Sequence, residues 1–135
     1  MSTLRIVRGL PGSGKSTFAK EYLSGESNMV HLEADMYHVN TNGDYDWHAE
    51  NLKKSHEWCF ESTKIFLNNG IEVVVSNTFT THKEMKPYID FCKNKYHKLI
   101  VYRRVNYYGN IHNVPPEVIQ KMSERFEGYE GEKIV

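Results

Sequence analysis

The fold of this chain is decided near its start, by the stretch Gly9-Leu10-Pro11-Gly12-Ser13-Gly14-Lys15-Ser16. It fits the pattern G-x-x-x-x-G-K-[ST], in which glycines let the backbone turn so that successive N–H groups converge on phosphate oxygens. The lysine of this pattern reaches the β- and γ-phosphates, and the hydroxyl after it binds Mg²⁺. We therefore predict a phosphate site made by Gly9, Pro11, Gly12, Ser13, Gly14, Lys15, Ser16 and Thr17.

The residues on either side of this loop have the patterns that the motif requires. Residues 4–8 are typical of a strand, and residues 16–23 are typical of a helix. Strand, glycine-rich loop and helix are the arrangement that distinguishes a phosphate-binding loop from an ordinary turn. The helix N-terminus would add a partial positive charge beneath the phosphates.

The rest of the chain alternates between strand and helix patterns. A helix is predicted over 52–67 with Gly70 as its C-terminal cap, and Thr81 and Glu84 have the spacing of a capping box. Pro87 must open or kink the helix that follows. The Asn-Gly pair within 39–47 predicts a small hairpin or an ordered loop. Further strands are predicted at 29–33, 71–76 and 98–103, a last helix at 118–126 and a terminal strand at 132–135.

This alternation predicts an α/β protein with the three-layer fold of P-loop NTPases: a mostly parallel sheet with helices on both faces. A chain of 135 residues is expected to form a single domain over 1–135. Lys and Arg number 17, as do Asp and Glu, which argues against a dedicated nucleic-acid binder. No run is apolar enough for a membrane span and no signal peptide is evident, so we expect a cytoplasmic protein, monomeric or weakly dimeric.

Polar residues follow the ends of several predicted strands, where ligands of such sheets bind. Asp35, after the second strand, has the position of a general base that accepts a proton from a substrate hydroxyl and helps to hold the metal through water. The alternative is an N-cap for the turn at residues 36–37. The strand at 71–76 ends in Ser76-Asn77-Thr78 without the carboxylate of an ATPase, but Asn77 and Thr78 have side chains that can bind substrate.

Basic residues follow the fourth strand. An arginine near the equatorial oxygens of a transferring phosphoryl group stabilises the charge that builds there. Either Arg103 or Arg104 is expected to have this role, and the sequence does not decide between them. His112 lies in the loop before Pro115, where it either contacts substrate or stiffens the loop. Cys59 and Cys92 fall on apolar helix faces, so buried reduced thiols are predicted.

The chain resembles the polynucleotide-kinase-type P-loop kinases over almost its whole length. The resemblance lies in residues 8–17, Glu33-Ala34-Asp35-Met36-Tyr37, residues 56–59, 76–80 and 84–88, and Asn110-Ile111-His112-Asn113-Val114-Pro115. It implies ATP and Mg²⁺ at the loop, with Asp35 at the place of the catalytic aspartate. The family's polynucleotide kinase has an aspartate where this chain has Asn77. The family's lid commonly has an arginine where this chain has Gly109, so Arg103 or Arg104 would have to replace it.

Three functions are compatible with these residues. The first is a kinase that transfers the γ-phosphate of ATP to a hydroxyl of a nucleic-acid 5′ end or a nucleotide. The second is a kinase of a small metabolite or sugar-nucleotide, as in toxin-type P-loop kinases. The third is a nucleotide-binding regulatory protein with little turnover. The absent carboxylate after residue 76 and Gly109 favour the third function, and Asp35 opposes it.

Overall fold

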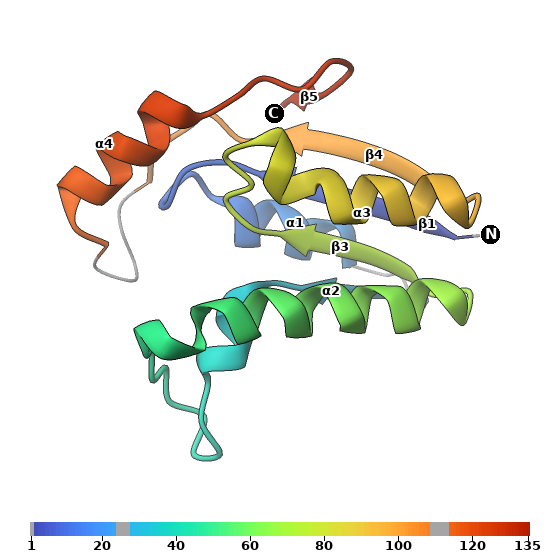
Figure 1. Ribbon diagram of the computed structural model, residues 1–135, viewed down its shortest axis with the longest axis horizontal. Helices are drawn as coiled ribbons and strands as arrows, with labels where there is room; N and C mark the ends of the chain where they lie inside the picture. The colour runs from blue at the N-terminus through green and yellow to red at the C-terminus, as the bar shows by residue number, and fades with distance from the viewer. Residues whose placement is uncertain (1, 24–27, 109–113) are drawn as a thin grey trace.

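The computed structural model describes residues 2–23, 28–108 and 114–135, and its centre is a parallel sheet of five strands (Figure 1). The order of the strands across the sheet is β2-β3-β1-β4-β5, and each pair of neighbours is parallel. The predicted fold is therefore confirmed. The strands are β1 Thr3–Arg8, β2 Met29–Leu32, β3 Glu72–Ser76, β4 Lys98–Arg103 and β5 Lys133–Ile134.

Apolar residues fill the middle of the sheet because the central strands are covered on both faces. In β1, Leu4, Ile6 and Val7 are completely buried, and so is the run Val73 to Val75 of β3. Nearly continuous aliphatic residues are typical of parallel strands that have no solvent-facing side. The registry places Ile6 between Val75 and Val101, so β1 holds the two halves of the sheet together.

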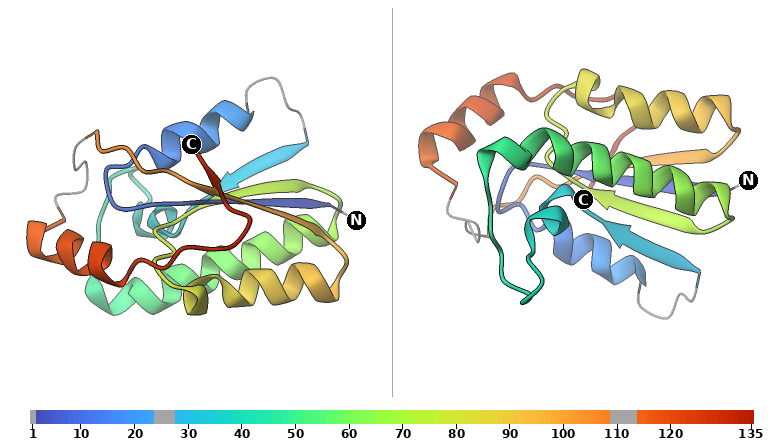
Figure 2. Two further views of the ribbon diagram at one scale, coloured as in Figure 1. Left: turned by 90° about the horizontal axis from the view of Figure 1, so that it is seen from above. Right: turned by 60° about the horizontal axis from the view of Figure 1, so that its bottom comes forward.

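Helices cover both faces of the sheet (Figure 2). The helix α1 (Lys15–Leu23) packs on one face, where Ala19 joins a small core with Val7 and Val74. The larger core lies on the other face, beneath α2 (Leu52–Asn68) and α3 (His82–Asn94). Cys59 and Cys92, which were predicted to be buried reduced thiols, both lie in this larger core as free thiols.

The ends of the helices agree with the predicted signals. Gly70 has a φ of 77° just after α2, and its N–H donates to Leu67 O. The capping box of α3 is complete, with Thr81 accepting from Glu84 N and the Glu84 carboxylate accepting from Thr81 N. The helix α3 begins before Pro87, which lies inside it. The last helix, α4 (Pro116–Arg125), lies beyond the carboxyl ends of the strands (Figure 1).

The segment between β2 and α2 also lies at the carboxyl edge of the sheet. A short 3₁₀ helix, η1 (Ala34–His38), follows β2 directly, and a second, η2 (Ala49–Asn51), precedes α2. Between them, Val39 and Tyr45 form an antiparallel bridge across a turn in which Gly43 has a φ of 84°. The predicted small hairpin is therefore present. Among the described residues, no helix combines the length and the hydrophobicity that a membrane crossing requires.

Candidate functional site

The loop between β1 and α1 has the shape of a phosphate cradle. Gly12 and Gly14 have φ values of 83° and 85°, which side chains disfavour, and Ser13 N donates to Leu10 O across the turn at 3.1 Å. A Cβ at Gly9 would lie 2.5 Å from Ser13 Oγ and 2.8 Å from Arg104 O. Backbone therefore packs closely around the loop, and the loop leads directly into the N-terminus of α1.

Two polar side chains of the loop, Lys15 and Ser13, have positions suited to binding an anion. The Lys15 ammonium donates to Leu10 O at 2.9 Å, and Ser13 Oγ is buried without a hydrogen-bond partner. Burial lowers the pKa of Lys15 from 10.5 to about 8, although the nearby charges of Glu33 and Asp35 raise it. A desolvated lysine and an unpaired hydroxyl both gain partners when phosphate oxygens enter the loop.

The carboxylate of Glu33 lies beside the loop, and sequence reasoning did not identify it as a site residue. Ser16 Oγ donates to Glu33 Oε2 at 2.6 Å, and Ser76 Oγ donates to the same oxygen at 2.8 Å. The last pair of β2 and β3 is Leu32 with Val75, so the next residues, Glu33 and Ser76, come level with each other. Although no acidic residue directly follows β3, the Glu33 carboxylate, directly after β2, therefore lies beside Ser76.

A buried histidine completes this group of side chains. His31 Nε2 lies 2.6 Å from Ser76 Oγ and 3.7 Å from Glu33 Oε2. Burial lowers the pKa of His31, so the ring is neutral at neutral pH and does not neutralise the Glu33 carboxylate. The position of Glu33 at a strand end was the signal that could have found it, because the same reasoning selected Asp35.

Asp35 lies in the first turn of η1, on the same edge as the loop. The N-cap position of η1 is Glu33, so the capping alternative for Asp35 is wrong. The Tyr45 hydroxyl donates to Asp35 Oδ1 at 3.3 Å, and burial together with this carboxylate raises the pKa of Tyr45 to about 12. The negative charge of Asp35, like that of Glu33, raises the pKa of Lys15 and so opposes the effect of burial on that lysine.

Asn77 and Thr78 lie on this edge, and both make hydrogen bonds within the protein. Asn77 Oδ1 accepts from Ala34 N at 2.9 Å, and its Nδ2 lies 3.7 Å from Cys59 Sγ. The amide is buried, so it fixes the start of η1 relative to the end of β3. Thr78 O accepts from Gly9 N at 3.3 Å and holds the start of the loop.

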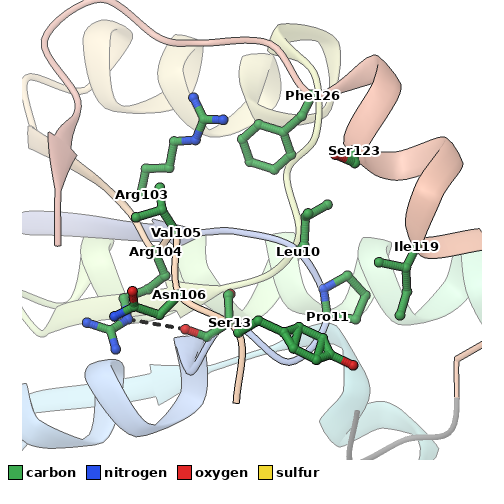
Figure 3. A pocket seen from close by; sticks show the side chains of 11 residues that line it. Leu10, Pro11, Ser13, Arg103, Arg104, Val105, Asn106, Ile119, Ser123 and Phe126 are labelled. Carbon is green, nitrogen blue, oxygen red and sulfur yellow. Dashed lines mark hydrogen bonds between the residues drawn. The ribbon is translucent and has the colours of Figure 1, made fainter. Parts of the chain in front are cut away.

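The two arginines at the end of β4 face different parts of the molecule (Figure 3). Arg104 Nε donates to Ser13 O at 3.3 Å, and its Nη2 donates to the Tyr108 hydroxyl at 3.1 Å. Arg103 stacks on Phe126, 4.4 Å from the ring centroid, and lies 3.5 Å from a Glu132 oxygen. The structure therefore brings Arg104 to the phosphate loop, whereas Arg103 packs against the C-terminal segment.

Both arginines line a pocket next to the loop. Its lining comes from three parts of the chain: the loop itself, the end of β4 with the segment after it, and α4 with the residue that follows it. The residues are Leu10, Pro11, Ser13, Arg103, Arg104, Val105, Asn106, Tyr107, Ile119, Ser123 and Phe126. Two residues that entered the sequence predictions, Gly109 and His112, lie outside the described residues.

The oxygens around Ser16 fit a magnesium ion that accompanies a nucleotide. Mg²⁺ in phosphate-transfer sites takes one or two protein oxygens, waters and phosphate oxygens. Ser16 Oγ and Glu33 Oε2 supply such oxygens next to the cradle. The described residues contain no cluster of three His, Cys, Asp or Glu side chains, so the ion would depend on the phosphates for its remaining ligands.

Comparison with known protein sequences gives matches over most of the chain. A family described as "AAA domain" matches residues 4–106. The uncharacterized protein PM0531 of Pasteurella multocida (strain Pm70) is 30% identical over 90% of this chain and 75% of its own length. Human NEDD4-binding protein 2 is 29% identical over 93% of this chain, and the chain spans 8% of that protein's length.

Solved structures share the fold at low sequence identity. A chain in the structure of the Pnkp1/Rnl/Hen1 RNA repair complex superposes with a TM-score of 0.63 at 22% identity, over 92% of this chain and 37% of its own length. A sugar kinase from Janibacter sp. HTCC2649 gives a TM-score of 0.68 at 15% identity, over the whole of this chain and 84% of its own. These likenesses show the three-layer P-loop kinase fold.

Proposed function

Because the chain belongs to the AAA domain family of P-loop kinase-type proteins, we propose that it is an ATP-dependent kinase that transfers the γ-phosphate to a hydroxyl. The observation that carries the proposal is the meeting of an acidic and a basic group at one edge of the sheet. Asp35 lies in the first turn of η1, shortly after β2, and its charge raises the pKa of the partly buried Lys15 of the phosphate loop. A carboxylate near a phosphate loop is what transfer to an alcohol needs.

In this proposal ATP binds with its phosphates in the loop of residues 9–17. Lys15 contacts the β- and γ-phosphates, and the buried hydroxyl of Ser13 gains a hydrogen-bond partner from the phosphate oxygens. Mg²⁺ would be held by Ser16 directly and by Glu33 and Asp35 directly or through water. When bound, the ion neutralises charge on the β- and γ-phosphates.

The remaining roles belong to side chains around the loop. Asp35 accepts the proton of the acceptor hydroxyl, for which it must lie within hydrogen-bond reach. Arg104 contacts the loop through Ser13 O and is the arginine we assign to the developing phosphoryl charge. Asn77 acts on the site by holding Ala34, next to Asp35, and so positions the proton acceptor.

For the acceptor we propose a hydroxyl of a nucleic-acid 5′ end or a nucleotide. The likeness to a chain of an RNA repair complex supports this class, and the likeness to a sugar kinase supports a small metabolite as the second candidate. The lack of excess positive charge also favours a small acceptor over a long nucleic acid. In this proposal Glu33, which lies level with Ser76 and accepts from Ser16, supplies the carboxylate that is absent after residue 76, and this weakens the regulatory alternative.

Transfer of labelled γ-phosphate from ATP to a panel of acceptors tests the proposal. The panel holds oligonucleotides with 5′-hydroxyl ends, nucleotides, nucleosides and simple sugars. Asp35→Asn should abolish transfer while ATP affinity changes little, and Asp90→Asn, an exposed change on α3, should leave both unaltered. Tight ATP binding without transfer to any acceptor would overturn the kinase and leave the regulatory protein.

A further inference from the structure

Exposed aromatic rings stand next to Asp35. Tyr37, Tyr45 and Trp47 have 37%, 41% and 48% of their surfaces exposed, respectively. Each ring centroid lies 6.1 Å from that of the buried His38, which joins the three rings into one group. We call these four residues the aromatic wall. Large aromatic side chains that gather at the surface mark a binding site more often than isolated ones do.

The aromatic wall is continuous with the proposed proton acceptor. Tyr37 and His38 belong to η1, the same short helix that carries Asp35. Tyr45 bonds to the Asp35 carboxylate, and the bridge between Val39 and Tyr45 closes the hairpin over η1. These rings therefore lie beside the remaining atoms of any molecule whose hydroxyl reaches Asp35.

The charges of the segment that carries the aromatic wall disfavour an anionic occupant. Residues 33–50 contain neither Lys nor Arg. The acidic residues of this segment are Glu33, Asp35, Asp44, Asp46 and Glu50. A phosphate group next to Asp44, Asp46 and Glu50, which have no part in the proposed metal site, would be repelled, and no Lys or Arg of the same segment would compensate. A neutral ring that stacks on Tyr or Trp meets no such penalty.

We propose that the aromatic wall is the acceptor subsite and that it takes the base of a nucleoside, whose hydroxyl then lies at Asp35. The proposal rests on the proposed kinase function and narrows its acceptor to a nucleoside that carries no phosphate over the acidic segment. Every nucleobase has a π-face that stacks on aromatic side chains. In addition, His38, whose ring contacts all three exposed rings, has a buried Nδ1 without a hydrogen-bond partner.

A binding experiment tests the subsite independently of catalysis. We would titrate adenosine, guanosine, cytidine and uridine into the full chain saturated with a non-hydrolysable ATP analogue and follow the heat. Trp47→Leu should lower the affinity for the nucleoside that binds best by at least about fivefold, which is the lower end of the loss expected when one stacking ring is removed. Trp47→Phe should keep most of the affinity. The affinity for the ATP analogue should change less than twofold in both variants.

A matched control is available at the opposite edge of the sheet. Tyr96 follows α3, precedes β4 and has 82% of its surface exposed. Tyr96→Leu removes an exposed ring of similar size and should leave nucleoside affinity unchanged. If Trp47→Leu has no more effect than Tyr96→Leu, or if no nucleoside binds at all, the proposed subsite is wrong.

The charge argument has a separate test. We would compare kcat/KM for the preferred nucleoside, its 3′-monophosphate and an oligonucleotide that begins with it. The nucleoside should be the best acceptor, and Asp44→Asn with Asp46→Asn should improve the two phosphorylated acceptors only. An oligonucleotide or a simple sugar as the best acceptor would overturn the subsite but keep the kinase. Absence of all transfer would overturn the kinase, and nucleoside binding would still decide the subsite.

Discussion

Ser16 Oγ donates a hydrogen bond of 2.6 Å to Glu33 Oε2, so the carboxylate of the residue directly after β2 contacts the hydroxyl of the phosphate loop. Changing Glu33 to Gln removes the charge and keeps the size. We expect the gain in ATP affinity that Mg²⁺ provides to fall about tenfold, the lower end for partners of metal ligands. Calorimetric titrations of ATP with and without Mg²⁺ measure this gain, and Glu61→Gln, at an exposed position of α2, is the control. An undiminished Mg²⁺ effect in Glu33→Gln would show that this carboxylate is not part of the metal site.

Lys15 should make ATP binding depend on pH. Burial lowers its pKa to about 8, so in the free protein the ammonium loses its proton as the pH rises through that value. Bound phosphates favour the charged form, so above that pH binding must take up a proton. ATP affinity should then fall about tenfold between pH 7 and pH 9. Titrations in two buffers with different ionisation enthalpies would count the proton, and Lys15→Met should show neither the uptake nor the decline. A constant affinity across this range would contradict the assignment.

A buried ion pair ties the C-terminal segment to the central strand. Arg8 Nη1 lies 2.9 Å from Glu132 Oε1, and the Arg8 side chain is completely buried. Glu132→Ala leaves that charge without its partner, which typically costs about 3–5 kcal/mol of unfolding free energy. Urea denaturation measures the loss, and Glu130→Ala, an exposed neighbour, should be nearly neutral. Equal midpoints for the two variants would show that the pair does not stabilise the fold.

Acid should weaken the same ion pair. Burial by itself raises the pKa of Glu132, but the hydrogen bond from Tyr129 N and the charge of Arg8 outweigh it, so that the pKa is lowered. The stabilisation is therefore present above the unfolded pKa of a glutamate and is lost as the pH falls through the lower folded value. The difference in unfolding free energy between the wild type and Glu132→Gln should shrink on acidification. A difference that is the same at pH 7 and at pH 3 would contradict this.

Gly9 lies where a larger residue would clash with neighbouring atoms. A Cβ at this position would lie 2.8 Å from Arg104 O, a backbone atom that side-chain rotation cannot move. Gly9→Ala should cost about 1–3 kcal/mol of unfolding free energy, as overpacking usually does, and should also weaken ATP binding. At Gly128 the nearest atom to a Cβ would be 3.7 Å away, so Gly128→Ala is the matched control. Thermal melts with and without ATP separate the two effects.

Much of the fold was predictable because its signals are local. The loop at 9–16, the aliphatic run of β3 and the capping box at Thr81 each depend on residues close together in the sequence. Sequence reasoning also predicted that Asp35 and the loop would meet, since carboxyl ends of parallel strands share one edge.

The parts of the site that were missed depend on long-range geometry. Glu33 reaches Ser16 only because the registry of β2 and β3 brings it level with Ser76. The choice between Arg103 and Arg104 depends on the alternation of side chains at the end of β4, which sends one to Ser13 and the other to Phe126. The hydrogen bond from Ala34 N to Asn77 Oδ1 likewise joins residues that are far apart in the sequence, so sequence reasoning, which assigned Asn77 to the substrate, did not predict it.

The compactness of the segment after β2 has a thermodynamic consequence. Glu33, beside the phosphate loop, and His38, within the aromatic wall, are the two ends of one short run that Asn77 anchors at Ala34. An acceptor that orders the rings must also order the carboxylate beside Ser16. ATP and the acceptor are therefore expected to bind cooperatively, and linkage requires each to change the other's affinity by the same factor.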